Sequence, residues 1–101
     1  MAVNLKAITS CLGYQQITSL SAAAGLTVPV VDANGLAVKP TIAIITPEAA
    51  AVRWRDDGTD PTGTVGMPLA SGVTLQYDGD ITKIRFIQQA PGAIINISYY
   101  A

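Results

Sequence analysis

Charged side chains crowd around the only tryptophan of this 101-residue chain, in the stretch VRWRDDGTDPTGTVGMPL from Val52 to Leu69. The chain has only six basic and seven acidic residues, and five of them fall within eight positions here. Aspartates at this spacing could bind a cation or exchange protons with a substrate, and arginines could clamp them or reach another subunit. The five residues are Arg53, Arg55, Asp56, Asp57 and Asp60.

The spacing of these residues supports a metal site or a catalytic carboxylate pair less well than it supports a pair of tight turns. The aspartates surround Gly58, but the calcium-loop pattern D-x-D/N-x-D/N-G with a distant glutamate is not met. The neighbouring arginines would neutralise the carboxylates, and the chain has no histidine to assist acid–base or nucleophilic chemistry. We therefore expect no metal, no cofactor and no catalytic residue, and we expect that the protein is not an enzyme.

Two tight turns explain the same residues more simply. Asp57-Gly58 permits a turn with positive φ, and in Asp60-Pro61-Thr62-Gly63 the aspartate can accept backbone N–H bonds while the proline fixes φ. Arg53 or Arg55 can clamp this connection through a bidentate pair with an aspartate. Such a clamp at a subunit contact would fix geometry, so we predict that Arg53→Ala weakens assembly more than folding.

Short apolar runs position this loop. Residues 49–55 alternate in polarity, which predicts a strand with the arginines facing outward and Trp54 packed in the core against Phe86 and Ile97. Strands recurring every ~10–15 residues with turns between them are typical of a sandwich or barrel. We predict an all-β fold, a small single-domain β-sandwich or jelly-roll-like barrel over residues 1–101. Further strands are predicted at residues 41–46, where Pro47 ends the run, and at 65–69, 73–77, 84–86 and 95–100.

The N-terminal part of the chain is less periodic. Residues 1–12 are candidates for an arm that docks elsewhere and grips a partner, and residues 21–25 are a candidate for a single helical turn. Residues 30–40 contain Asn34-Gly35, a strong two-residue hairpin signal between the short apolar runs 30–31 and 36–38. We therefore predict a hairpin over residues 30–40.

Composition limits the function classes. The net charge of −1 provides no basic field for nucleic acid, and no apolar run approaches the ~18 residues of a membrane span. Only 13% of residues are charged, which leaves a surface poorly protected against association. Cys11 is alone, so no internal disulfide can form, and we expect it to be buried or half-buried. We see no signal peptide and expect a soluble, reducing compartment.

Several motifs, in order, resemble small proteins encoded among the structural genes of tailed bacteriophages. The most specific is the run R-W-R-D-D-G-x-x-P-T. The resemblance covers about residues 14–29 and 51–100. It rests on Tyr14-x-x-Ile17-Thr18, Leu26-Thr27-Val28-Pro29, Ala51-Val52-Arg53-Trp54-Arg55-Asp56-Asp57-Gly58, Asp60-Pro61-Thr62, Gly66-Met67-Pro68-Leu69, Gly72, Ile84-Arg85-Phe86-Ile87 and Asn96-Ile97-Ser98-Tyr99-Tyr100.

The resemblance implies a virion component, made in the host cytoplasm and placed on the capsid exterior as a decoration or cement protein. Its partner would be the major capsid protein, and a homotrimer is favoured over a dimer because such proteins often sit on local three-fold axes. The protein would clamp adjacent capsid subunits with no chemistry. Residues 30–40 look inserted relative to the family pattern.

Two alternatives stay open. The first is a structural component of the neck or tail. The second is a glycan-binding module on the virion surface, because stacking on sugars requires aromatic side chains. Those of this chain are more often half-buried sheet residues. The candidates for a stacking face are Trp54, Tyr77, Tyr99 and Tyr100.

Overall fold

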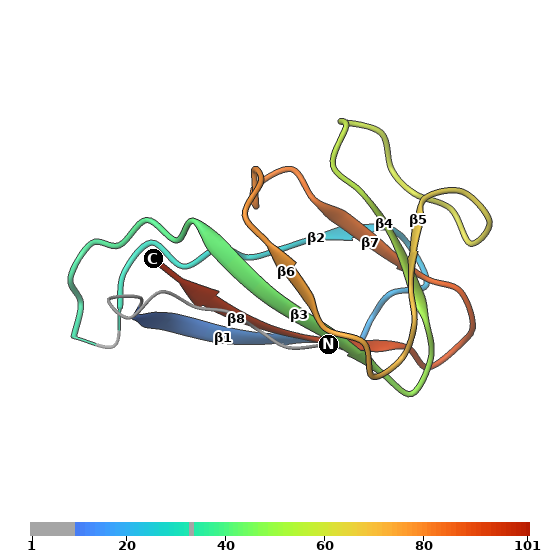
Figure 1. Ribbon diagram of the computed structural model, residues 1–101, viewed down its shortest axis with the longest axis horizontal. Coiled ribbons are helices and arrows are strands. Elements are labelled where there is room, and N and C mark those ends of the chain that lie inside the picture. The colour runs from blue at the N-terminus through green and yellow to red at the C-terminus, as the bar shows by residue number, and fades with distance from the viewer. Residues whose placement is uncertain (1–9, 33) are drawn as a thin grey trace.

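Two four-stranded antiparallel sheets pack face to face in the computed structural model, which describes residues 10–32 and 34–101 (Figure 1). Within the described residues every regular element is a strand, so the predicted all-β class is confirmed. The strands are β1 (Cys11–Ile17), β2 (Ala24–Gly25), β3 (Ile42–Glu48), β4 (Val52–Arg55), β5 (Met67–Leu69), β6 (Leu75–Tyr77), β7 (Arg85–Gln88) and β8 (Ile94–Tyr100).

The strand order is that of a chain folded as one long hairpin and then rolled up. The first strand pairs with the last, β2 with β7, β3 with β6 and β4 with β5, all antiparallel. Rolling brings β3 beside β8 and β4 beside β7, which gives sheet orders β1-β8-β3-β6 and β2-β7-β4-β5. This is the eight-stranded jelly roll, one of the two forms that the sequence predicts.

Alternation along the long strands builds the core between the sheets. Ile95, Ile97 and Tyr99 on β8 are buried, and the side chains between them are only half-buried. Across the sandwich, Ile84 and Phe86 are completely buried, as their alternation with charged residues predicts. Burying these apolar side chains between two sheets is the main stabilising term for such a domain.

Two strands near the N-terminus were not predicted. Cys11 and Leu12, assigned to an arm by the sequence, belong to β1, and residues 1–9 of that proposed arm lie outside the described residues. A bulge between Cys11 and Gly13 shifts the register against β8 and breaks the alternation that would have revealed β1. The helical turn proposed for residues 21–25 is wrong, because Ala24–Gly25 pairs with β7 as β2.

Pro47 does not end its strand, as the sequence predicts, but continues it. It lies opposite Ile95 within β3, and its carbonyl accepts a hydrogen bond of 2.8 Å from the N–H of Gly72, in the connection that precedes β6. The backbone nitrogen of a residue points to the same side as its carbonyl, so the missing N–H faces away from β8. Proline is tolerated at such a position because no ladder hydrogen bond to β8 is lost.

The predicted strand over residues 49–55 is shortened because the chain changes sheets there. Ala49 has φ 71, which turns the backbone from β3 toward the other sheet, and regular pairing resumes only at Val52. The runs 65–69 and 73–77 likewise pair only as β5 and β6, from Met67 and Leu75 onward.

The Asn34-Gly35 signal does mark a turn, but not the two-residue turn that it predicts. The Gly35 N–H donates to the Asp32 carbonyl at 3.0 Å, so Gly35 is the fourth residue of the turn and takes its left-handed position, with φ 78. The Asp32 carboxylate accepts the Asn34 and Leu36 N–H groups. Among the described residues of this segment, Val31 and Ala37 form an isolated antiparallel β-bridge.

Candidate functional site

Three connections and most of the described charged residues meet at one end of the sandwich, which we call the loop end. The connections are residues 26–41 after β2, 56–66 after β4 and 78–84 after β6, and the antiparallel order places all three at the same end of the strands. The four connections at the opposite end, residues 18–23, 49–51, 70–74 and 89–93, contain no charged residue, and Glu48 at the end of β3 lies next to them. The charged stretch around Trp54 therefore lies at the same end of the sandwich as the 26–41 and 78–84 connections.

Arg53 holds the 56–66 loop against β4. Its Nη1 donates to the Gly66 carbonyl at 2.8 Å. With the Gln89 amide oxygen turned toward it, Nε and Nη2 also donate to Gln89 at 2.9 and 3.1 Å. Gly66 is required at this point: its φ is 137, and a Cβ would lie 3.1 Å from Pro61 and 3.2 Å from the Trp54 carbonyl oxygen.

Arg55 forms the bidentate pair that the sequence predicts for one of the arginines. Its Nε lies 3.0 Å from Asp57 Oδ1 and its Nη2 lies 2.5 Å from Asp57 Oδ2. The hydrogen bond from Arg55 lowers the pKa of Asp57, and the same bond raises the pKa of Arg55. Asp57 also accepts the Thr59 N–H, and Gly58 between them has φ 86, as the predicted turn requires. Asp57 is exposed and Arg55 is partly exposed, so the pair fixes local shape more than it stabilises the fold.

Asp56 and Asp60 turn away from this pair toward other strands. Asp56 accepts a hydrogen bond of 2.5 Å from the hydroxyl of Tyr77 at the end of β6. Burial, followed by the bond to Asp56, raises the pKa of Tyr77. Asp60 forms a salt bridge with Nε of Arg85 at 3.0 Å. The prediction that Asp60 accepts backbone N–H bonds within the turn of residues 60–63 is therefore wrong. The Nη2 of Arg85 also donates to the Ala23 carbonyl beside β2.

The five charged residues therefore do not converge on a common point. Each of the three aspartates has a different partner, and the described residues contain no group of three His, Cys, Asp or Glu side chains placed to hold a metal ion. The arrangement braces the 56–66 loop on β4, β6 and β7. Its predicted role as a subunit contact stays a prediction.

Trp54 differs from its predicted place. Phe86 and Ile97 are completely buried, as predicted, but Trp54 is half-buried and packs against the margin of the core. It lies opposite Phe86 in the sheet and makes an edge-to-face contact with Tyr77, at 5.9 Å between ring centroids and 69° between planes. Trp54 sits next to the last residue of β4, where the sandwich opens toward the loops.

The four aromatic candidates do not form a common surface for stacking. Tyr77 is 8% and Tyr99 only 1% exposed, and the Tyr99 hydroxyl donates to Gln15 Oε1 at 2.7 Å. Burial raises the pKa of Tyr99 to about 12. Tyr100 is half-buried on the outer face of the other sheet from Trp54. Of the four candidates for a glycan platform, Trp54 and Tyr77 contact each other edge to face, whereas Tyr99 is buried and Tyr100 lies on the other sheet from Trp54, so the four do not share one surface.

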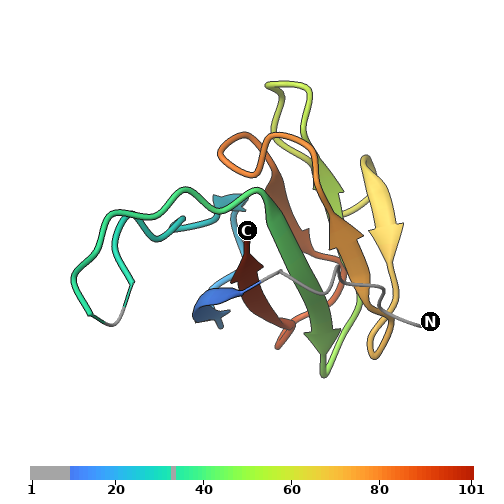
Figure 2. The same cartoon turned by 60° about the vertical axis from the view of Figure 1, so that its left-hand side comes forward.

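The sequence predicts a hairpin over residues 30–40, but it does not reveal that the whole connection of residues 26–41, which we call the strap, projects from the domain (Figure 2). Figure 2 shows its described residues, teal to green, reaching away from the two sheets. At its base Thr27 N–H donates to Gln15 Oε1, and Pro29 lies against Gly13 of β1. At its tip three large apolar side chains face solvent, with exposed fractions of 72% for Val30, 51% for Val31 and 65% for Leu36.

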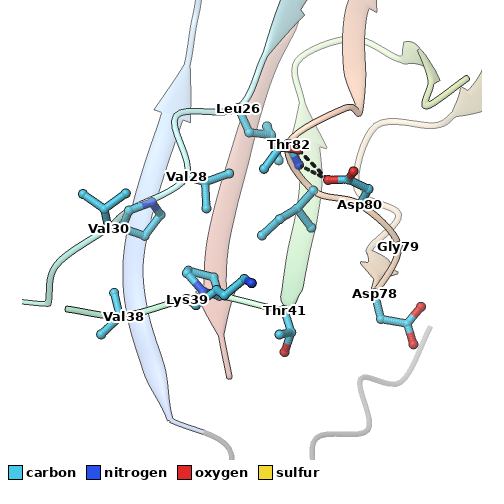
Figure 3. Close-up of a pocket in the computed structure, with 13 residues that line it drawn as sticks. Leu26, Val28, Val30, Val38, Lys39, Thr41, Asp78, Gly79, Asp80 and Thr82 are labelled. Carbon is cyan, nitrogen blue, oxygen red and sulfur yellow. Dashed lines mark hydrogen bonds between the residues drawn. The ribbon is translucent and has the colours of Figure 1, made fainter. Parts of the chain in front are cut away.

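A pocket of about 630 Å³ opens between the strap and the 78–82 loop (Figure 3). The run Val30-Val31 is the sequence signal that could have suggested an apolar tip, but a short apolar run more often predicts a buried strand.

Cys11, expected to be buried or half-buried, is exposed on β1.

Comparison with known proteins adds no assignment to this geometry. The described residues contain no helix that is long and apolar enough to cross a membrane. No protein-family model matches the chain, and neither a curated protein nor a solved structure resembles it at a significant level.

Proposed function

We propose that this chain is a structural protein that works by associating with neighbouring subunits, as a decoration or cement protein on the capsid exterior of a tailed phage. The phage context rests on the sequence motifs around residues 51–62 and 84–100. Its partners would be the major capsid protein and further copies of itself, with a trimer favoured over a dimer. A position at the neck or tail is the alternative placement.

The observation that carries the proposal is the apolar tip of the strap. Val30, Val31 and Leu36 expose most of their surface on a segment that projects from the domain. Leaving such side chains in water brings no gain to an isolated domain, whereas burying them against a neighbour contributes roughly 25 cal/mol per Å² of apolar surface. A projecting apolar hairpin therefore suits a protein that reaches an adjacent subunit.

The charge distribution supports the same role. Around Trp54 the aspartates and arginines are paired within the chain, which leaves them little charge to offer to an ionic ligand. Jelly rolls serve in viral capsids, and equally in lectins and cupins, so the fold supports the virion role by analogy only. Association through shape and apolar burial fits a chain with so few charges.

The proposal is tested by mixing the purified protein with bare capsids and imaging them, after light scattering or mass photometry gives its own oligomeric state. We expect a defined oligomer, favoured as a trimer, that decorates the capsids. In the double variant Val31→Ser, Leu36→Ser, we expect decoration to be lost and the melting temperature to be unchanged. Val73→Ser, a 37% exposed residue at the opposite end, is the matched control and should decorate normally. A monomer that never binds phage particles or shell subunits would overturn the proposal.

A further inference from the structure

A hollow of about 440 Å³ lies between the start of β1 and the tip of the strap. Its lining combines residues 11–14 of β1, which end in the aromatic Tyr14, with the acid Asp32 and the amide Asn34 of the strap. Sites of this size hold small molecules, and a few polar groups in them fix the orientation of the ligand. The hollow is separate from the pocket between the strap and the 78–82 loop, with which it shares no described residue.

Tyr14 offers a flat apolar surface beside this hollow. It is 63% exposed, more than any other aromatic residue in the described part of the chain. Its hydroxyl donates a 2.5 Å hydrogen bond to Asn96 Oδ1 on the neighbouring strand β8. Asn96 alternates with the buried Ile95 and Ile97, so the bond holds the ring on the outer face of the sheet. A ring that is fixed at its hydroxyl and still exposed is preorganised for stacking, because little side-chain entropy is lost on binding.

Polar groups continue from Tyr14 across three strands. Gln16 Nε2 donates to Asn96 Oδ1 at 2.9 Å, and Asn96 Nδ2 donates to Glu48 Oε1 at 2.9 Å. These bonds hold amide and carboxylate groups side by side on β1, β8 and β3, which are adjacent in the sheet (Figure 1). Within the described residues, Gln16 Oε1 and Glu48 Oε2 take part in no hydrogen bond. Both atoms can therefore accept hydrogen bonds from a ligand.

The charges around Tyr14 indicate which kind of ligand fits. The acids are Asp32 and Glu48, and neither the described lining of the hollow nor the hydrogen-bond network on the sheet contains a basic residue. An anionic ligand would therefore meet two carboxylates with no counter-charge. Asp32 already accepts two backbone N–H groups and Glu48 accepts two side-chain amides, so both carboxylates serve as hydrogen-bond acceptors. A neutral ligand that is rich in hydroxyl groups suits such a lining.

We propose that Tyr14 and the polar groups on either side of it form a binding site for a neutral saccharide. A pyranose ring presents C–H groups on its face and hydroxyls around its rim. Its face stacks on Tyr14, and its hydroxyls reach Gln16 and Glu48 on one side and Asp32 and Asn34 on the other. Tyr14 is not among the four aromatic residues that the sequence suggested for stacking on sugars. The inference does not depend on the proposed capsid role.

NMR titration of the isotope-labelled, full-length protein tests the site directly. The neutral probes are maltotriose, cellotriose, mannotriose and lactose, and sialyllactose is the acidic counterpart of lactose. We expect at least one neutral probe to cause saturable shifts in the side-chain amide signals of Gln16, Asn34 and Asn96. The side-chain amide of Gln89, which lies beyond the end of β7 in the other sheet, should stay unchanged. Sialyllactose should bind more weakly than the best neutral probe, because its carboxylate meets Asp32 and Glu48.

Substitutions separate stacking from hydrogen bonding. Tyr14→Ala should weaken saccharide binding by about tenfold or more, because the stacking surface is lost. Tyr14→Phe keeps the ring and is the matched control, with a loss of less than about threefold. Gln16→Ala and Asn34→Ala should each weaken binding by about threefold to tenfold, because each removes one polar contact. Unchanged melting temperatures show that all four variants are folded.

Three results would overturn the proposal. The first is the absence of saturable shifts with every neutral probe, and the second is binding that Tyr14→Ala leaves unchanged. The third is a Tyr14→Ala variant that loses capsid decoration while the native protein binds no saccharide, which would make this face a protein contact. The titration uses no capsids. Saccharide binding by a protein that never decorates capsids would therefore support this site and refute only the proposed function.

Discussion

The hydroxyl of Tyr77 donates a hydrogen bond of 2.5 Å to Oδ2 of Asp56, and this bond joins the two sheets at the loop end. Tyr77 is the last residue of β6, and Asp56 directly follows β4 in the other sheet. The same tyrosine ring lies edge to face with Trp54. Its hydroxyl lies so close to Gly79 that a Cβ there would clash. Tyr77 therefore organises the loops that carry the charged residues.

Tyr77→Phe should lower the free energy of unfolding by about 1–2 kcal/mol, because the substitution removes a partly buried hydrogen bond to a carboxylate and keeps the ring. Urea unfolding followed by Trp54 fluorescence measures this loss. Tyr14→Phe is the matched control, since its hydroxyl bonds to Asn96 on an exposed face, and it should cost less than about 0.5 kcal/mol. Equal losses in the two variants would contradict the role given to Tyr77.

Stability should fall at alkaline pH. The pKa values of Tyr77 and Tyr99 are raised in the folded protein, that of Tyr99 to about 12, while an unfolded tyrosine titrates near pH ~10. The folded state therefore holds protons that the unfolded chain loses, and the free energy of unfolding decreases as pH rises above ~10. Denaturation midpoints from about pH 9 to about pH 11.5 test this, and Tyr99→Phe should flatten the slope. A pH-independent midpoint over that range would refute it.

Arg53 and Arg55 should differ, although they are two residues apart on one strand. Arg53→Ala removes the bond to the Gly66 carbonyl and the contacts with Gln89, and should lower the unfolding free energy by about 1–2 kcal/mol. Arg55→Ala breaks only an exposed pair with Asp57 and should have a smaller effect. Parallel measurements of stability and capsid binding show whether Arg53→Ala weakens assembly beyond its folding cost. If it does not, Arg53 acts only as a clamp within the domain.

Gly66→Ala should be more destabilising than Gly58→Ala. Both glycines have positive φ, but only at Gly66 would a Cβ meet other atoms, at 3.1 Å from Pro61 and 3.2 Å from Arg53, whereas Gly58 faces open space. We expect a loss of about 2–3 kcal/mol at Gly66 and about 1 kcal/mol at Gly58. Thermal unfolding of the two variants compares them directly. Similar melting temperatures would show that the 56–66 loop is not held closely against β4.

The core assignment predicts a contrast between two isoleucines. Ile97→Ala should cost about 2–5 kcal/mol, because this side chain is completely buried between the sheets. Ile44→Ala should cost less than half as much, because Ile44 is half-buried on the outer face of the same sheet. Urea titration of both variants provides the measurement. A larger loss at Ile44 would mean that its face is covered in solution by something that the described residues do not include.

The strands that the sequence predicted correctly are those with long, regular alternation. Ile95, Ile97 and Tyr99 repeat every second residue, so their burial follows from the geometry of any half-buried strand. β1 escaped prediction because a bulge interrupts its alternation and because it has a neighbour on one side only, so fewer of its side chains are buried. β2 is two residues long, too short for any periodicity.

The sequence by itself determined that this chain folds as a small all-β domain with a tight charged loop after Trp54, because alternation and turn preferences are local properties. Only the tertiary structure decided which partners the charges have. Asp56 meets Tyr77 at a separation of 21 residues, and Asp60 meets Arg85 at a separation of 25. It also decided that Val30, Val31 and Leu36 face solvent. Such pairings depend on how the long hairpin rolls up. Rolling brings distant segments together, and the local sequence of one segment does not indicate which other segment it will contact.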